Sequence, residues 1–158
     1  MKGSEFDELR FFAAVSASGA RALLIGRRAL VLLGLPVLTV DYDFWLHVDD
    51  IEAFNAAASP FELLPSHTAA EARGRGRYVL QNDEIVDVLV ARSVTTVDGV
   101  RVAFDDVWNG RRSVSIAEST TIAIPSIPDL ISTKRFAARP KDLDDIRLLE
   151  VLRAKESR

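Results

Sequence analysis

The most informative stretch of the sequence is Leu38-Thr39-Val40-Asp41-Tyr42-Asp43-Phe44-Trp45-Leu46. It places two aspartates one residue apart in an apolar run, which predicts a β-strand over residues 37–48. Side chains two positions apart in a strand point to the same face, so Asp41 and Asp43 are expected to project side by side. Two carboxylates this close repel each other unless a cation lies between them.

A third aspartate, Asp87, lies in another apolar run, Ile85-Val86-Asp87-Val88-Leu89-Val90. Burying a carboxylate is costly, so three of them need compensation. The pattern therefore predicts a divalent metal, Mg²⁺ or Mn²⁺, bound by Asp41 and Asp43 and completed by Asp87 from a neighbouring strand. The alternative is that Asp41 and Asp43 are solvated acids at a strand edge or turn and that Asp87 is a paired structural carboxylate.

Composition describes an ordinary globular chain and excludes several classes of protein. The 158 residues are 48% hydrophobic and 27% charged, with a net charge of −3, which gives no overall attraction to nucleic acid. No apolar run reaches about 18 residues, so no membrane span is expected. The absence of Cys excludes disulfides and thiolate metal sites and fits a cytoplasmic location.

The order of predicted elements indicates a mixed α+β fold in one domain spanning residues 1–158. An N-terminal segment (1–19) carries a helix over 5–18, a sheet core occupies 20–125, and C-terminal helices occupy 126–158. Within the core, a strand over 22–25 is broken by Gly26 and followed by a helix over 27–33. Further expected elements are a helix over 51–58, a hairpin of 78–81 with 85–91, strand pairs at 95–97 with 100–104 and 114–116 with 121–124, and helices opened by Pro128 and Pro140.

These features together resemble the nucleotidyltransferase fold superfamily. The resemblance rests on Leu24-Ile25-Gly26-Arg27-Arg28-Ala29-Leu30, on the Asp-x-Asp strand, on Ile85-Val86-Asp87-Val88-Leu89, and on the tail from 129 to 146 with its Arg139-Pro140-Lys141-Asp142-Leu143 sequence. It covers residues 20–152, and the tail is similar to that of small bacterial members such as AbiEii-like toxin components. The fold it implies is a mixed β-sheet flanked by helices, with further helices at the C-terminus.

The resemblance also implies an activity, which is transfer of a nucleoside monophosphate from an NTP to a hydroxyl of RNA, such as tRNA, or of protein. Asp41, Asp43 and Asp87 are then the catalytic, metal-binding residues. The nucleotide-binding positions are Gly26, Arg27, Arg28 and Lys134. A toxin-type member is further expected to have a cognate antitoxin.

One position departs from the family pattern, because members usually have Gly-Gly or Gly-Ser at the turn where this chain has Gly26-Arg27. Arg27 or Arg28 either grips phosphates with its guanidinium or forms an ordinary salt bridge on a helix surface. If the bulky side chain closes the pocket, the protein binds a nucleotide or a partner without turnover. A third hypothesis is a nucleic-acid-binding adaptor that uses the basic loop of Arg73, Arg75 and Arg77.

Overall fold

The computed structural model describes residues 6–136 and 139–157; residues 1–5, 137, 138 and 158, some of them in predicted helical segments, lie outside this range. The helices are α1 (Glu8–Ala17), α2 (Gly26–Leu32), α3 (Ile51–Ala58), α4 (Ala69–Arg75), α5 (Phe104–Asn109), α6 (Ile127–Lys134) and α7 (Pro140–Glu156). The strands are β1 (Ala22–Ile25), β2 (Tyr42–Leu46), β3 (Leu64–Pro65), β4 (Arg77–Gln81), β5 (Ile85–Leu89), β6 (Ser93–Thr95), β7 (Arg101–Ala103), β8 (Arg112–Ala117) and β9 (Thr120–Ile124). Two 3₁₀ turns, η1 (Val48–Asp50) and η2 (Ser59–Phe61), flank α3. Among the described helices, none is long and apolar enough to span a membrane.

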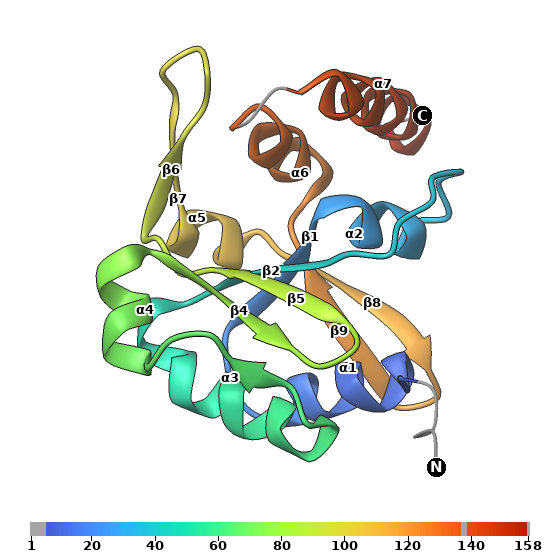
Figure 1. Ribbon diagram of the computed structural model, residues 1–158. Coiled ribbons are helices and arrows are strands. Elements are labelled where there is room, and N and C mark those ends of the chain that lie inside the picture. The colour runs from blue at the N-terminus through green and yellow to red at the C-terminus, as the bar shows by residue number, and fades with distance from the viewer. Residues whose placement is uncertain (1–5, 137–138, 158) are drawn as a thin grey trace.

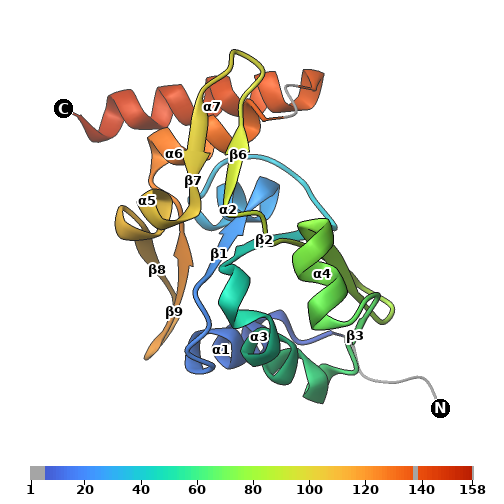
Figure 2. The same ribbon diagram turned by 90° about the vertical axis from the view of Figure 1, so that its left-hand side faces the viewer.

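The centre of the fold is a five-stranded mixed sheet with the order β1-β2-β5-β4-β3. β2 and β5 run parallel, and the other neighbouring strands are antiparallel. In both ribbon views α1 and α3 lie on one side of this sheet, while α6 and α7 lie on the opposite side (Figures 1 and 2). The predicted α+β class, with a mixed sheet flanked by helices and helices at the C-terminus, is confirmed.

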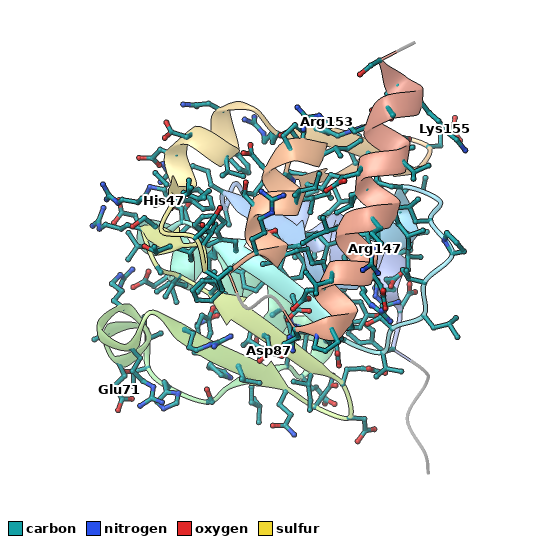
Figure 3. All side chains as sticks on the ribbon, turned by 90° about the horizontal axis from the view of Figure 1, so that it is seen from above. His47, Glu71, Asp87, Arg147, Arg153 and Lys155 are labelled. Atoms are coloured by element: carbon teal, nitrogen blue, oxygen red, sulfur yellow. The ribbon has the colours of Figure 1, made fainter. Side chains whose placement is uncertain are left out.

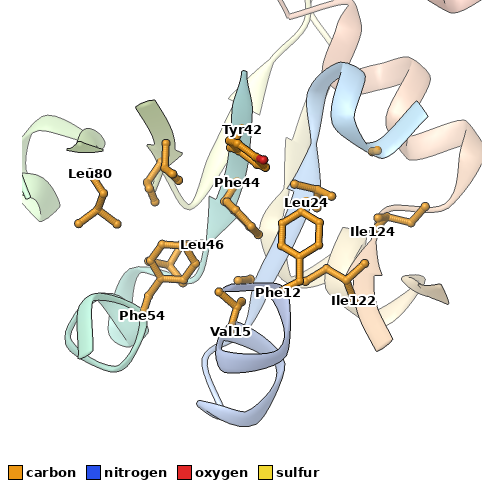
Figure 4. Close-up of a cluster of buried hydrophobic side chains, with 14 of the residues drawn as sticks. Phe12, Val15, Leu24, Tyr42, Phe44, Leu46, Phe54, Leu80, Ile122 and Ile124 are labelled. Carbon is orange, nitrogen blue, oxygen red and sulfur yellow. The ribbon is translucent and has the colours of Figure 1, made fainter. Parts of the chain in front are cut away.

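Alternation along β2 divides its side chains between two environments. Tyr42, Phe44 and Leu46 face the main hydrophobic core beside α1 and α3 (Figure 4). The Phe44 ring lies edge-on to that of Phe54, with 5.2 Å between ring centroids. Such aromatic pairs contribute about 0.5–1.5 kcal/mol beyond the area that they bury. The hydrophobic pattern of this face therefore fixes the register of β2, because a slip of one residue would bring Asp43 into the core.

The opposite face of β2 carries Asp43 and Trp45. Trp45 is fully buried in a second hydrophobic cluster with residues such as Leu23, Val94 and Phe104, and its indole Nε1 donates a hydrogen bond of 2.8 Å to the Ala91 carbonyl. This cluster lies where α5 and the β6–β7 hairpin join the sheet (Figure 2). Asp43 therefore shares a face with a packed tryptophan but lies at the end of the strand next to α6 and α7.

Three details of the predicted elements are wrong. The strand predicted over 95–97 is β6, Ser93–Thr95. The strand predicted over 37–48 comprises only Tyr42–Leu46, because the segment before it follows α2 as an irregular connection whose Leu38 and Val40 are exposed. Helix α5 was not predicted, and its first residue, Phe104, was assigned to a strand. Six residues are too few to show helical periodicity, although Asp105 and Asp106 in the first turn are typical of a helix start.

Candidate active site

Asp43 and Asp87 occupy facing positions on two adjacent parallel strands. The β2–β5 register pairs Asp43 with Asp87, between the pairs Tyr42–Val86 and Phe44–Val88. Both aspartates are half-buried, whereas the two valines are buried in the core. Seen from above, Asp87 lies on the sheet close to the beginning of α7 (Figure 3). The structure thus brings these two predicted site residues together on one face of the sheet.

The ionised form of Asp43 is disfavoured in the folded protein. Burial raises the pKa of its carboxyl from 3.8 to about 6, with further contributions from the negative charges of Asp87 and Asp41 and a partial offset from Lys134. Desolvation and like charge both penalise the ionised form. An additional positive charge next to Asp43 and Asp87 would favour the ionised form and offset this penalty.

Gly26 follows β1 and brings the backbone against the Asp43 carboxylate. Its φ of +69° is one that L-residues with a side chain rarely adopt. A Cβ atom at this position would lie 2.6 Å from Oδ2 of Asp43. Glycine is therefore needed here for two independent reasons, the backbone conformation and the close approach of an acidic side chain.

Substituting Gly26 by Ala is expected to destabilise the protein by more than the backbone cost alone. Forcing Ala into a left-handed conformation costs about 1–2 kcal/mol. Gly34→Ala is the matched control, because Gly34 has a φ of +82° and a Cβ atom added there would have no neighbouring atom within 4 Å. Urea unfolding of both variants would measure the difference, and equal losses would contradict a close contact between Gly26 and Asp43.

A cavity of about 270 Å³ lies between this end of the sheet and the helices α6 and α7. Its ionisable lining comprises three acids and three bases, Asp43, Asp87, Asp142, Arg77, Lys134 and Arg139. Arg139 donates to Asp142 through its Nε at 3.0 Å, and Lys134 lies with its Nζ 2.8 Å from Oδ2 of Asp145, directly behind the cavity wall. The cavity therefore combines a carboxylate pair on the sheet with cations held by the helices.

The arrangement of helices and strands that carries this site recurs in solved structures. The fold is nucleotidyltransferase-like. A protein from Thermotoga maritima that is proposed to be a nucleotidyltransferase superposes with a TM-score of 0.55 at 17% identity, over 93% of this chain and 88% of its own. The antibiotic-resistance factor ANT(2″)-Ia superposes with a TM-score of 0.61 at 14% identity, over 94% and 88%. No family model matches the sequence, and no curated protein is detectably similar to it.

Asp41 lies outside the strand that carries Asp43. In this nucleotidyltransferase fold β2 begins at Tyr42, so Asp41 precedes the strand, is exposed and does not line the cavity. Its amide donates to the Thr39 hydroxyl at 3.0 Å. The expectation that alternation within one strand places Asp41 beside Asp43 is therefore wrong, although its charge still raises the pKa of Asp43.

The carboxylate pair offers the oxygen donors that a hard divalent cation prefers. Among residues 6–136 and 139–157, however, no three His, Cys, Asp or Glu side chains are grouped so that they could hold a metal ion. A pair of facing carboxylates with no third acid grouped beside it fits a cation that is completed by ligands from outside the protein.

Arg27 and Arg28 are held by contacts outside the cavity lining. The Nε of Arg27 donates to Oδ2 of the buried Asp145 at 3.1 Å, and its Nη1 donates to the Leu38 carbonyl at 3.3 Å. Arg28 pairs with Glu8 at 3.2 Å, and its guanidinium carbon lies 4.2 Å from the ring centroid of Tyr42. The Arg28–Glu8 pair matches the alternative of a salt bridge on a helix surface, whereas Arg27 pairs with a fully buried carboxylate. A role of either arginine in nucleotide binding stays a prediction.

The three arginines predicted to form a basic loop have different environments. Arg73 and Arg75 belong to α4, and Arg77 begins β4 after the left-handed Gly76. Arg73 pairs with Glu52 and donates to the Val48 carbonyl, whereas Arg77 lines the cavity. The expectation of a basic loop is therefore wrong, and Arg77 alone of the three faces the candidate active site.

Three residues of the site were not recognised from the sequence as functional, namely Arg139, Asp142 and Asp145. In α7 the apolar Leu143 is exposed, and the buried residues are Asp142, Asp145, Ile146 and Leu149. The sequence spacing did indicate their burial, since Asp142 and Asp145 lie three residues apart and so share a helix face with Ile146 and Leu149.

Proposed function

We propose that this protein is a metal-dependent nucleotidyltransferase that moves a nucleoside monophosphate from an NTP to a hydroxyl group. The observation that carries the proposal is the Asp43–Asp87 pair at a cavity with cationic walls, in a nucleotidyltransferase fold. Asp43 and Asp87, with Asp41 nearby, are the residues to hold Mg²⁺ or Mn²⁺. When bound, such an ion stabilises the charge that develops on the transferred phosphoryl group.

The other lining residues suit a polyphosphate. Lys134, Arg139 and Arg77 provide positive charge for the phosphate oxygens of the NTP, and charge-assisted hydrogen bonds of this kind are among the strongest in proteins. Gly26 lets the backbone lie directly against the Asp43 carboxylate at the cavity. These features support nucleotide binding through the phosphates and leave the identity of the base open.

In the proposed reaction the acceptor oxygen attacks the α-phosphorus while the bond to pyrophosphate breaks. In this proposal Asp87 accepts the hydroxyl proton, and pyrophosphate leaves with the electron pair of the broken bond. Lys134 and Arg139 hold the departing phosphates. A positioned general base of this kind typically contributes about 10²–10⁴-fold to the rate.

The acceptor is proposed from the resemblance of the chain to small AbiEii-like proteins. An RNA, in particular tRNA, or a protein hydroxyl are the candidates, and a toxin of this kind would have a cognate antitoxin. The exposed arginines near the site, such as Arg75 next to the cavity residue Arg77, are consistent with an anionic acceptor.

Label transfer tests the proposal directly. The protein is incubated with each of the four ribonucleoside triphosphates labelled at the α-phosphate, with Mg²⁺ or Mn²⁺, and with total tRNA or cell lysate. We expect label on one class of acceptor, reduced at least about 100-fold in Asp87→Asn. Asp83→Asn, in the exposed β4–β5 turn, is the matched control and should retain activity. If no nucleotide labels any acceptor, the proposed transfer reaction is refuted.

The exposure of Asp41 favours one second candidate, a protein that binds a nucleotide or a partner without turnover. A binding protein needs the cationic walls of the cavity but not a complete set of three acids. Equilibrium dialysis with MgATP distinguishes the two, because binding without label transfer would support the second candidate. If the protein neither binds MgATP nor transfers label, nucleotide binding without turnover is excluded as well.

A further inference from the structure

Asp145 is a fully buried carboxylate held by two cations from different helices. Its Oδ2 accepts hydrogen bonds from Lys134 Nζ at 2.8 Å and from Arg27 Nε at 3.1 Å. Its other oxygen, Oδ1, is buried and has no hydrogen-bond partner among the described residues. Asp145 is 0% exposed, so its negative charge depends on these two partners.

Lys134 is also within reach of a ligand, because it lines the cavity as well as contacting Asp145. It lies with its Nζ 3.8 Å from Oδ1 of Asp142, so one ammonium group serves two buried carboxylates. A polyphosphate in the cavity competes with both for this ammonium. If Lys134 turned to the phosphates with nothing to replace it, a buried carboxylate would lose its counter-ion, which is strongly unfavourable.

Each of the two carboxylates has an arginine of its own. Arg139 holds Asp142, with Nε 3.0 Å from Oδ2 and Nη2 3.5 Å from Oδ1. Arg27 holds Asp145 through a single bond to Oδ2, and the free acceptor Oδ1 lies on the same carboxylate. A guanidinium can bind both oxygens of a carboxylate at once, which an ammonium cannot do with the same geometry.

We infer that Arg27 is a positioning residue that neutralises Asp145 when Lys134 turns from it to an anionic polyphosphate in the cavity. The inference rests on the proposed function in that the cavity must take a polyphosphate, but it does not require catalysis. It gives the arginine in the Gly26-Arg27 turn a role other than phosphate binding or closure of the pocket. Arg27 acts on the ligand only through Asp145 and Lys134.

Binding of inorganic tripolyphosphate with Mg²⁺, measured by isothermal titration calorimetry, tests the inference without any transfer reaction. In Arg27→Ala, Lys134 is the remaining cation on Asp145, so moving Lys134 to the ligand would leave Asp145 without a counter-ion. The affinity for tripolyphosphate is therefore expected to fall roughly 10–100-fold, which corresponds to the free energy of one charge-assisted hydrogen bond. Arg27→Lys should recover part of the affinity. Arg147→Ala, which removes an exposed arginine of α7 paired with Asp144, is the control and should bind like the wild type.

The double variant Arg27→Ala/Asp145→Asn separates this role from a purely structural one. A neutral carboxamide at position 145 no longer holds Lys134 by charge, so the double variant should bind tripolyphosphate more tightly than Arg27→Ala. The side-chain ammonium resonance of Lys134, followed by NMR, should shift on ligand addition in the wild type and in the double variant, and much less in Arg27→Ala.

Each outcome bears on the inference separately from the proposed function. Unchanged binding in Arg27→Ala, or no recovery in the folded double variant, overturns the inference even if label transfer succeeds. Absence of tripolyphosphate binding in the wild type also overturns it, whereas the transfer reaction is judged by label transfer alone. Recovery in the double variant supports it even if no acceptor is ever labelled.

Discussion

Asp43→Asn is expected to make the protein more stable at neutral pH while abolishing the proposed transfer reaction. In the folded protein the pKa of Asp43 is about 6, against 3.8 without the surrounding structure. Between these values the unfolded chain binds fewer protons than the folded one, so the stability contributed by this group falls as the pH rises through them. Asn carries no charge, so the variant does not lose this part of the free energy of unfolding, which amounts to about 2–3 kcal/mol.

Urea unfolding at two pH values measures the effect. Above pH 6 and without divalent metal, Asp43→Asn should be the more stable protein, and near pH 4 the difference should largely vanish. Adding Mg²⁺ should stabilise the wild type more than the variant, since binding to the folded state alone raises stability. A variant less stable than the wild type at neutral pH would mean that ionised Asp43 is favourably held without a metal. Asp83→Asn again serves as the exposed control.

The largest loss of stability at a charged residue is expected for Asp145→Ala. The substitution leaves the buried ammonium of Lys134 and the guanidinium of Arg27 without the carboxylate that both contact. Removing one partner of a buried ion pair typically costs about 3–5 kcal/mol. The distance of 3.8 Å between Lys134 Nζ and Asp142 Oδ1 leaves a weaker contact for the ammonium, which places the expected loss at the lower end.

The neighbouring residue Asp144 provides the control, since its pair with Arg147 joins two side chains that are 67% and 73% exposed. Asp144→Ala should change the free energy of unfolding by no more than about 1 kcal/mol. Chemical denaturation of both variants at neutral pH makes the comparison. Similar losses in the two would show that the buried network around Asp145 contributes little to stability.

Much of the fold was predictable because its signals are local. The strand Ala22–Ile25, the turn at Gly26 and the hairpin of β4 and β5 follow from short apolar runs bounded by turn residues. Pro128 and Pro140 mark the first turns of α6 and α7. The start of β2 was misjudged because apolar residues at 37, 38 and 40 suggest a strand, although no neighbouring strand pairs with them in the described sheet.

The sequence by itself determined that Asp43 and Asp87 face away from the core, since each alternates with core residues in its strand. The tertiary structure alone decided which charges meet. Asp43 adjoins Asp87 because β2 and β5 are parallel neighbours, and Arg27 meets Asp145 across 118 positions of sequence because α7 packs near α2. Periodicity is a property of a few consecutive residues, whereas the compensation of a buried charge depends on which distant element comes close to it.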